Sequence, residues 1–296
     1  MHPQFAPQTW PRRQWLAALA ASGMAAAWPA WAQQRGRPVR RLISVGGALT
    51  EVVYALGAQS LLVATDTTSL YPEAATRTPK VGYLRQLSAE GLLSLQPDAL
   101  VGAADAGPAV VLEQVRAAGV RVELVPAQHS FEEVLRKVET VGRVTGREAQ
   151  AAQLAQRLQQ EWAQVSRQVA QATRRPRALF ILSHNGSPMV AGTDTAAHAL
   201  LTLAGADNVV TAFAGYRPLT AEAMAAAAPQ VIINSTQGIE ALGGVVVFWQ
   251  RPELALTPAF ARKALVTMEA SHLLGFGPRL PSAVQALHRQ MLQVTA

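Results

Sequence analysis

The sequence has 296 residues, of which half are hydrophobic, and a formal net charge of +7. A chain of this length and composition has enough apolar material for one large domain or two medium ones. Lysine and arginine form no dense run interleaved with aromatic residues, so the mild positive charge does not indicate a nucleic-acid-binding protein. The lack of cysteine excludes disulfides, thiolate metal sites and a lipid-anchored cysteine.

The N-terminal segment has the order of features found in a secretory leader. Arg12 and Arg13 precede an apolar stretch over 15–28, which is followed by an Ala-Trp-Ala cleavage site at 30–32. This pattern predicts that residues 1–32 are a signal peptide, and the arginine pair leaves export by the Tat or the Sec route open. No later stretch is long and apolar enough to span a bilayer. We therefore expect an exported protein that is not membrane-embedded and that stays in the periplasm of a Gram-negative cell.

From residue 40 onward, short β-rich segments alternate with helical ones. The pattern predicts strands over 41–45, 61–64, 99–101 and 121–125, and helices over 50–56, 89–95, 110–118 and 131–144. Strands that alternate with helices in this way indicate an α/β fold, in which a parallel sheet is covered by helices.

One long segment interrupts this alternation. Residues 147–173 contain no glycine or proline, and apolar residues recur there at three- and four-residue spacing, namely Ala151, Leu154, Leu158, Trp162 and Val165. The spacing predicts a single amphipathic helix, roughly 40 Å long at 1.5 Å per residue. Pro176 follows the end of this helix, and a second series of strands and helices begins with a strand over 178–182.

The second series repeats a motif of the first. Gly82-Tyr83-Leu84-Arg85 is followed by Leu-Ser-Ala-Glu, and Gly215-Tyr216-Arg217 is followed by Leu-Thr-Ala-Glu. This duplication predicts two α/β lobes, an N-terminal lobe over 40–145 and a C-terminal lobe over 175–296, with the connecting helix over 146–174. Two related lobes on a stiff helix create a cleft, which is a usual place for a ligand.

The repeated motif ends in an acid in each lobe. Ser88 and Thr220 are good N-cap residues, so Glu90 and Glu222 fall in the first turn of a helix. Complementarity to the helix dipole would alone explain one such acid. Two acids at matching places on two lobes predict a second role, in which they bind two basic sockets of a two-fold symmetric partner.

Tyr83 is the candidate ligand residue. It lies in a loop with Arg85 two residues on, and a nearby cation favours the anionic form of a phenol. Phenolate is a hard oxygen donor for ferric iron, and tyrosine is a known axial ligand of haem iron. The guanidinium can also pair with a carboxylate, and Tyr216 and Arg217 offer a similar pair in the second lobe. Packing of both tyrosines against loop backbone is the alternative interpretation.

The histidines and the search for enzyme motifs say less about function than the tyrosines do. His184 follows the strand at 178–182, where the loops of α/β folds contact ligands, but a surface histidine is an equally good interpretation. The histidines have no HxH or HExxH spacing, which argues against a zinc or manganese binder. The chain has no GxSxG elbow, P-loop or intact GxGxxG, so we do not expect an enzyme.

Four segments, at 66–72, 81–91, 215–219 and 273–279, carry a resemblance to a known family. Through them the chain resembles the haem-binding periplasmic proteins of bacterial haem ABC importers, within the cobalamin and siderophore binding-protein superfamily. The resemblance covers residues 41–292, nearly all of the chain after the predicted leader. It implies two Rossmann-like lobes with parallel sheets, joined by a long rigid α-helix.

The resemblance also implies a ligand, which is haem, and a role for the candidate residues. Tyr83 would ligate the haem iron, and Arg85 would hydrogen-bond to its phenolate. Further contacts with one haem or two would come from Arg217, Tyr216 and His184. Tyr71 is a rival ligand because it is close in sequence, although its neighbour Pro72 suits a turn.

A partner follows from the same resemblance. Glu90 and Glu222 would dock onto arginines of the permease dimer of a haem importer, to which the protein would deliver haem as a monomer. The alternative keeps the fold and changes the ligand to cobalamin or an iron siderophore. Such a site would not require the Tyr-x-Arg pair.

Overall fold

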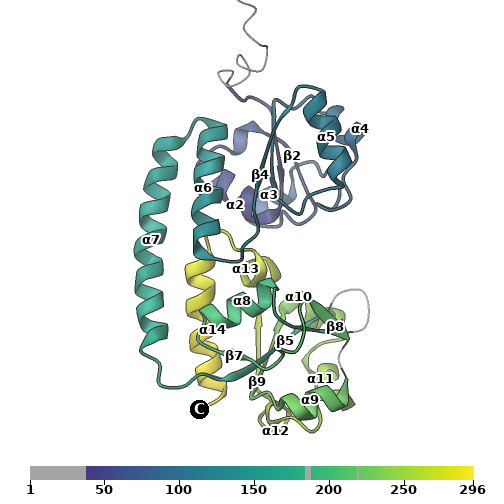
Figure 1. Ribbon diagram of the computed structural model, residues 1–296, viewed down its shortest axis with the longest axis vertical. Helices are drawn as coiled ribbons and strands as arrows, with labels where there is room; N and C mark the ends of the chain where they lie inside the picture. The colour runs from purple at the N-terminus through teal and green to yellow at the C-terminus, as the bar shows by residue number, and fades with distance from the viewer. Residues whose placement is uncertain (1–37, 184–187, 219) are drawn as a thin grey trace, which may run out of the picture. The chain divides into compact units, whose positions relative to one another are not determined.

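The computed structural model describes residues 38–183, 188–218 and 220–296 (Figure 1). The signal peptide predicted for residues 1–32 therefore lies outside the described residues. Strands and helices alternate along the chain, and they form one sheet from residues 42–125 and another from residues 177–268. None of the helices in the described ranges combines the length and the apolar character that a membrane crossing requires.

The first sheet has four parallel strands in the order β2-β1-β3-β4. These strands are β1 (Leu42–Val45), β2 (Leu62–Thr65), β3 (Ala99–Ala103) and β4 (Arg121–Val125). Every residue of β1 is buried, as expected for an inner strand of a parallel sheet with both faces covered. The predicted strand over 121–125 coincides with β4.

Helices cover both faces of this sheet. They are α2 (Gly47–Ala55), α3 (Glu73–Thr76), α4 (Ala89–Leu93), α5 (Ala109–Ala117) and α6 (Phe131–Thr145), and a 3₁₀ turn η2 (Gln59–Leu61) precedes β2. Successive residues of β1 point to opposite faces, so Leu42 joins the apolar cluster of α2 and α6, whereas Ile43 joins the cluster of α4 and α5.

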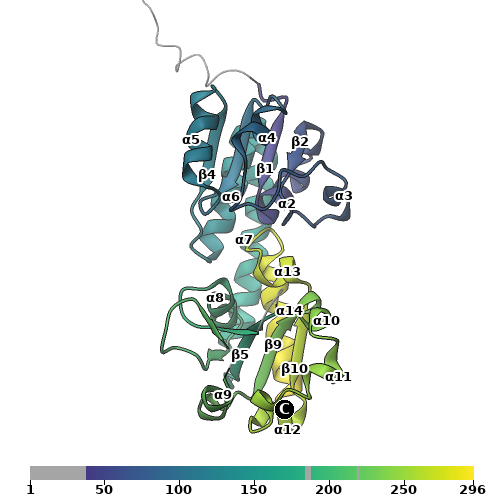
Figure 2. The same cartoon turned by 90° about the vertical axis from the view of Figure 1, so that its right-hand side faces the viewer.

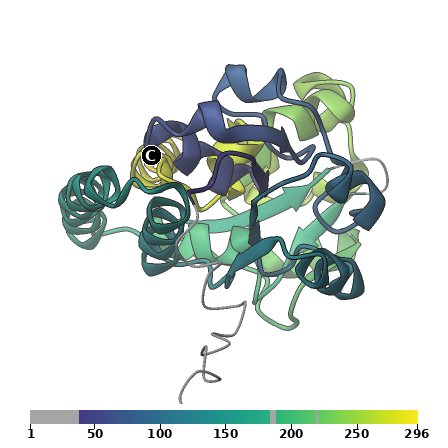
Figure 3. The same cartoon turned by 90° about the horizontal axis from the view of Figure 1, so that it is seen from above.

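The long helix predicted between the lobes is α7 (Glu148–Ala170), which ends three residues earlier than expected. It packs along α6 of the first lobe and along the C-terminal helix α14 (Leu280–Val294) of the second (Figure 1). Phe131 stacks on Trp162 of α7, with ring centroids 4.9 Å apart. Seen from above, the teal helices α6 and α7 stand beside the yellow α14, so the connecting helix α7 packs against a helix of each lobe (Figure 3).

The second sheet is mixed, which corrects the expectation of a parallel sheet in both lobes. Its order is β10-β9-β5-β6-β8, with β7 also paired to β5. The strands are β5 (Arg177–Leu182), β6 (Met189–Ala191), β7 (Asp207–Asn208), β8 (Tyr216–Pro218), β9 (Val231–Ser235) and β10 (Leu265–Met268). The β5–β6 and β6–β8 pairs are antiparallel. The connection from β5 to β6 has six residues, too few for the crossover that a parallel pair needs, which is a dozen residues or more.

The remaining helices lie around this second sheet (Figure 2). They are α8 (Ala196–Leu203), α9 (Ala221–Ala227), α10 (Thr236–Ala241), α11 (Val245–Phe248), η3 (Pro252–Leu254), α12 (Pro258–Arg262) and α13 (Ala270–Leu274). α13 and α14 return the chain to the first lobe, because the turn between them contacts α2, as described below.

One apolar cluster extends through both lobes. It includes Leu49 and Val53 of α2, Leu158 of α7, Ile232 of β9 and Leu287 of α14, all of them at most 1% exposed. A smaller cluster lies within the first lobe, on the face covered by α4 and α5. The shared cluster means that the lobes are joined by packed hydrocarbon as well as by the chain.

Candidate functional site

Two glycine–tyrosine pairs present the candidate site residues. Gly82 has a φ of +94° and Gly215 a φ of +79°, which is a left-handed conformation that any side chain would strain. This requirement explains why glycine precedes tyrosine in both lobes. Backbone hydrogen bonds hold the first loop, because Thr67 N donates to Gly82 O at 2.9 Å.

The first lobe presents Tyr83 with a cation on its hydroxyl. The residue is 38% exposed, so its ring is accessible to a ligand. Arg85 Nη1 donates to Tyr83 Oη at 2.9 Å. The opposite edge of the same guanidinium donates to Asp105 Oδ2, from Nε at 3.1 Å and also from Nη2. The hydrogen bonds to Asp105 raise the pKa of Arg85 further above neutrality, so the guanidinium stays charged beside the phenol.

In the second lobe, Tyr216 and Arg217 do not form a pair of this kind. They are neighbours in β8, and successive side chains of a strand point to opposite faces of the sheet. Arg217 instead lies over the ring of Phe213, with its Cζ 4.4 Å from the ring centroid. Burial raises the pKa of Tyr216, against the effects of a hydrogen bond with Thr195 and of the charge of Arg85. The phenol of Tyr216 is therefore protonated near neutral pH.

The charge of Arg85 in the first lobe lowers the pKa of Tyr216 in the second, an effect weaker than that of burial. Arg217 is exposed and forms no ion pair with any residue that the structure describes. His184 lies outside the described residues. Within the described ranges, no group of three or more His, Asp or Glu side chains could hold a bare metal ion.

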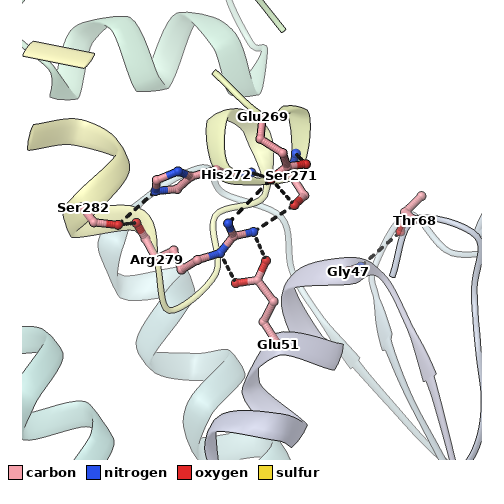
Figure 4. Close-up of polar contacts among 8 residues, drawn as sticks. All are labelled: Gly47, Glu51, Thr68, Glu269, Ser271, His272, Arg279 and Ser282. Carbon is pink, nitrogen blue, oxygen red and sulfur yellow. Dashed lines mark hydrogen bonds and ion pairs between the residues drawn. The ribbon is translucent and has the colours of Figure 1, made fainter. Parts of the chain in front are cut away.

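Tyr71 lies against a network of charged side chains that joins the two lobes. The Cζ atom of Arg279 is 3.7 Å from the centroid of the Tyr71 ring. Arg279 also donates two hydrogen bonds to Glu51 of α2, from Nε at 3.0 Å and from Nη2 at 2.6 Å (Figure 4). Ser271 Oγ accepts a further bond from Arg279 Nη2 at 2.9 Å, and Glu269 lies 3.6 Å from Nη1. Arg279 therefore connects the segment before α14 to the first lobe.

Sequence reasoning did not find this network, although a signal was present. Glu51 sits among the apolar residues of α2 and is 5% exposed, and a buried carboxylate requires a partner. Burial raises the pKa of Glu51, while the hydrogen bond and charge of Arg279 oppose that rise. Next to it, Lys137 Nζ of α6 donates to Phe276 O at 2.9 Å and pairs with Glu133. Charged groups thus lock the two lobes together where α2, α6 and the α13–α14 turn meet.

The two acids of the repeated motif occupy matching places. Ser88 Oγ accepts from Gly91 N at 3.4 Å at the start of α4, and Thr220 Oγ1 accepts from Ala223 N at 3.2 Å at the start of α9. Glu90 and Glu222 are in the first turns of these helices, and both are exposed. No described residue forms an ion pair with either acid, so both carboxylates face solvent.

A known protein family matches most of this sequence. Residues 42–271 match the model of the periplasmic binding protein family. The chain belongs to this family. Proteins of the family work with ABC transporter permeases, and the chain is thus a substrate-binding protein of an ABC importer.

Solved structures of haem-binding proteins are similar to it. The periplasmic haem-binding protein BhuT, in complex with two haems, is 43% identical with a TM-score of 0.83, and the alignment covers 86% of this chain and 99% of BhuT. The periplasmic haem-binding protein RhuT from Roseiflexus sp. RS-1, in apo form, is 32% identical with the same TM-score, over 87% of this chain and 99% of RhuT.

Curated relatives are more distant in sequence. An uncharacterised ABC transporter substrate-binding lipoprotein, YvrC of Bacillus subtilis, is 26% identical over 68% of this chain, and the match spans 65% of that protein's length. The vitamin B12-binding protein of Photorhabdus laumondii is 23% identical over 85% of this chain and 87% of its own length. The relatives therefore include two classes of ligand.

Proposed function

We propose that this protein captures haem through Tyr83 and delivers it to an ABC permease. The observation that carries the proposal is the exposed phenol of Tyr83 with the Arg85 guanidinium bonded to its oxygen. A cation at this place stabilises the negative charge that a phenolate carries when it binds ferric iron. The similarity to BhuT, a haem-binding protein, supports the same ligand.

Other residues around Tyr83 have chemistry that suits haem. The half-buried ring of Tyr216 offers an apolar face to a porphyrin, and its raised pKa makes it a poor phenolate donor. Arg217 is an exposed cation that can pair with a propionate carboxylate. His184 stays a prediction as a further contact, to the iron or to a second haem.

Ligand titration tests the proposal. Purified protein with haemin is expected to give a shifted Soret band that saturates at one or two equivalents, which also counts the haems bound. Cyanocobalamin, added at the same concentrations, is expected neither to bind nor to displace haem, because a phenolate–guanidinium pair gives it no specific contact. The measurement is absorption together with quenching of tryptophan fluorescence.

Cobalamin is the second candidate, because the Photorhabdus relative is a vitamin B12-binding protein. If cobalamin or a ferric siderophore bound saturably, while haemin bound with no defined stoichiometry, the proposal of haem as the ligand would be wrong. The substrate-binding role in an ABC importer would stand in either case.

Delivery of haem to a permease implies a cellular compartment for the protein and a surface that docks onto the permease. We propose export to the periplasm of a Gram-negative cell by the leader at residues 1–32, and docking of a monomer onto the permease dimer through Glu90 and Glu222. Both acids are exposed, and each is the acid in the first turn of its helix. Two such carboxylates on two lobes fit two basic sockets related by two-fold symmetry.

Charge reversal tests the docking role. The double variant Glu90→Arg, Glu222→Arg is expected to bind haem as the wild type does, while transport into vesicles that contain the permease falls about tenfold or more, since like charges then meet at the interface. Glu148→Arg is the matched control, because Glu148 is also an exposed acid in the first turn of a helix, α7. Normal uptake by the double variant, or an equal loss in the control, would remove the two acids from docking.

A further inference from the structure

Asp105 forms an ion pair with Arg85, and Arg85 is the cation that is hydrogen-bonded to the proposed iron ligand Tyr83. It lies in the loop between β3 and α5, twenty residues along the chain from Arg85. The guanidinium donates to Asp105 Oδ2 from Nε and Nη2, and its remaining nitrogen, Nη1, donates to Tyr83 Oη. One edge of the Arg85 guanidinium is thus fixed by the Asp105 carboxylate, and the other edge points at the phenol of Tyr83.

The backbone fixes the distance between these two loops. Gly107 N donates to Leu84 O at 2.9 Å, and Leu87 N donates to Gly107 O at 2.9 Å. Leu84, Leu87 and Ala106 are also buried in the same apolar cluster. A solvent-exposed ion pair usually fluctuates among several arrangements, but here each partner stands next to residues whose main chains are bonded to each other.

We propose that Asp105 is a positioning residue for the iron-binding phenol. It holds Arg85 in the orientation in which Nη1 meets Tyr83 Oη, and it occupies the guanidinium edge that would otherwise turn to a carboxylate of the ligand. Arg217, which forms no ion pair with an acid in the described ranges and lies over Phe213, is then the cation for a ligand carboxylate. This inference rests on the proposed function, since it assigns Asp105 a role in haem binding by Tyr83.

Haem release and the ferric phenolate charge-transfer band test the inference. Asp105→Ala is expected to speed the transfer of haem to an excess of apomyoglobin about fivefold, as for a coupled contact residue. The band is expected to shift in the same direction as in Arg85→Ala, because Arg85→Ala removes the cation and Asp105→Ala frees it to turn away from the phenolate oxygen. Asp105→Asn should fall between Asp105→Ala and the wild type, since its amide oxygen can still accept from Arg85.

A double-mutant cycle separates positioning from a direct effect of charge. If Asp105 acts through Arg85, the variant Arg85→Ala, Asp105→Ala releases haem at the rate of Arg85→Ala alone. Additive effects, a shift of the band opposite to that of Arg85→Ala, or an Asp105→Ala variant indistinguishable from the wild type would overturn the inference. Glu113→Ala, an exposed acid of α5, is the control and is expected to change neither readout. A wild type that shows no phenolate band would instead refute iron binding by Tyr83, and with it the proposed function.

Discussion

Tyr83→Phe is expected to weaken haem binding roughly 100-fold, which is about 2.7 kcal/mol at 25 °C, and to abolish the bands of ferric haem bound by phenolate. The substitution deletes the one oxygen that we propose as the iron ligand and keeps the ring. The loop should keep its conformation, because its tethers are main-chain bonds, from Thr67 N to Gly82 O and from Gly107 N to Leu84 O. Equilibrium titration with haemin, followed by absorption and resonance Raman spectra, measures both effects.

Tyr71→Phe is the matched control for this experiment. Tyr71 is another exposed tyrosine of the first lobe, 45% exposed, and its ring lies over Arg279 rather than beside a cation bonded to its hydroxyl. The control is expected to bind haem with the affinity and spectrum of the wild type. If Tyr71→Phe lost the phenolate bands and Tyr83→Phe kept them, the ligand role would pass to Tyr71.

The largest effect on stability is expected for Arg279→Met. This substitution removes the cation from the buried Glu51 carboxylate and leaves an unpaired charge where α2 meets the α13–α14 turn. Loss of one partner from a buried pair of this kind lowers the free energy of unfolding by about 3 kcal/mol. Chemical denaturation, monitored by circular dichroism, gives the value.

The loss of stability caused by Arg279→Met should depend on pH, and the protonation of Glu51 determines whether that loss grows or shrinks as the pH rises. Burial already raises the pKa of Glu51 in the wild type, and Arg279 opposes the rise, so removal of Arg279 raises that pKa further. A carboxyl group whose pKa is raised by folding favours the folded state when it is protonated, and this contribution is lost as the pH rises through the folded-state pKa. The destabilisation by Arg279→Met is therefore expected to be smaller at about pH 5 than at about pH 8.

Two comparisons make this prediction specific. Arg143→Met removes a more exposed partner, whose ion pair with Glu123 lies near the surface, and should cost less than about 1 kcal/mol. The double variant Glu51→Gln, Arg279→Met should recover much of the loss and have a flatter pH dependence, because the stranded carboxylate is gone. An Arg279→Met variant as stable as Arg143→Met would show that the network does not hold the lobes together.

Local patterns predicted the regular elements well. The strand at β4 and the helices α6 and α7 follow from apolar periodicity and from the positions of glycine and proline, which act over a few residues. The second sheet was harder, because β6 and β8 have three residues each and carry no periodic signal. The antiparallel pairing of β6 with β5 comes from the short connection between them, which periodicity does not reveal.

The contacts of the candidate site also differ in how far the sequence could predict them. The contact between Tyr83 and Arg85 lies within one loop, so their spacing in the sequence was informative. The contact between Arg85 and Asp105 joins two loops, and the ion pair between Glu51 and Arg279 joins residues 228 positions apart. Such partners meet only after the sheets and helices have packed, so a single sequence shows the need for a partner but not which residue meets it.

The apolar cluster shared by α2, α7 and α14 has a consequence for how the protein selects its ligand. Spreading the lobes would bring hydrocarbon into water, at about 25 cal/mol for each square ångström uncovered. The spacing between the Tyr83 loop and the β8 edge is therefore set in advance by the interior of the molecule. If these two segments hold the ligand as we propose, molecules too bulky or too thin for that spacing are expected to bind poorly, because the lobes cannot adjust to them without uncovering hydrocarbon.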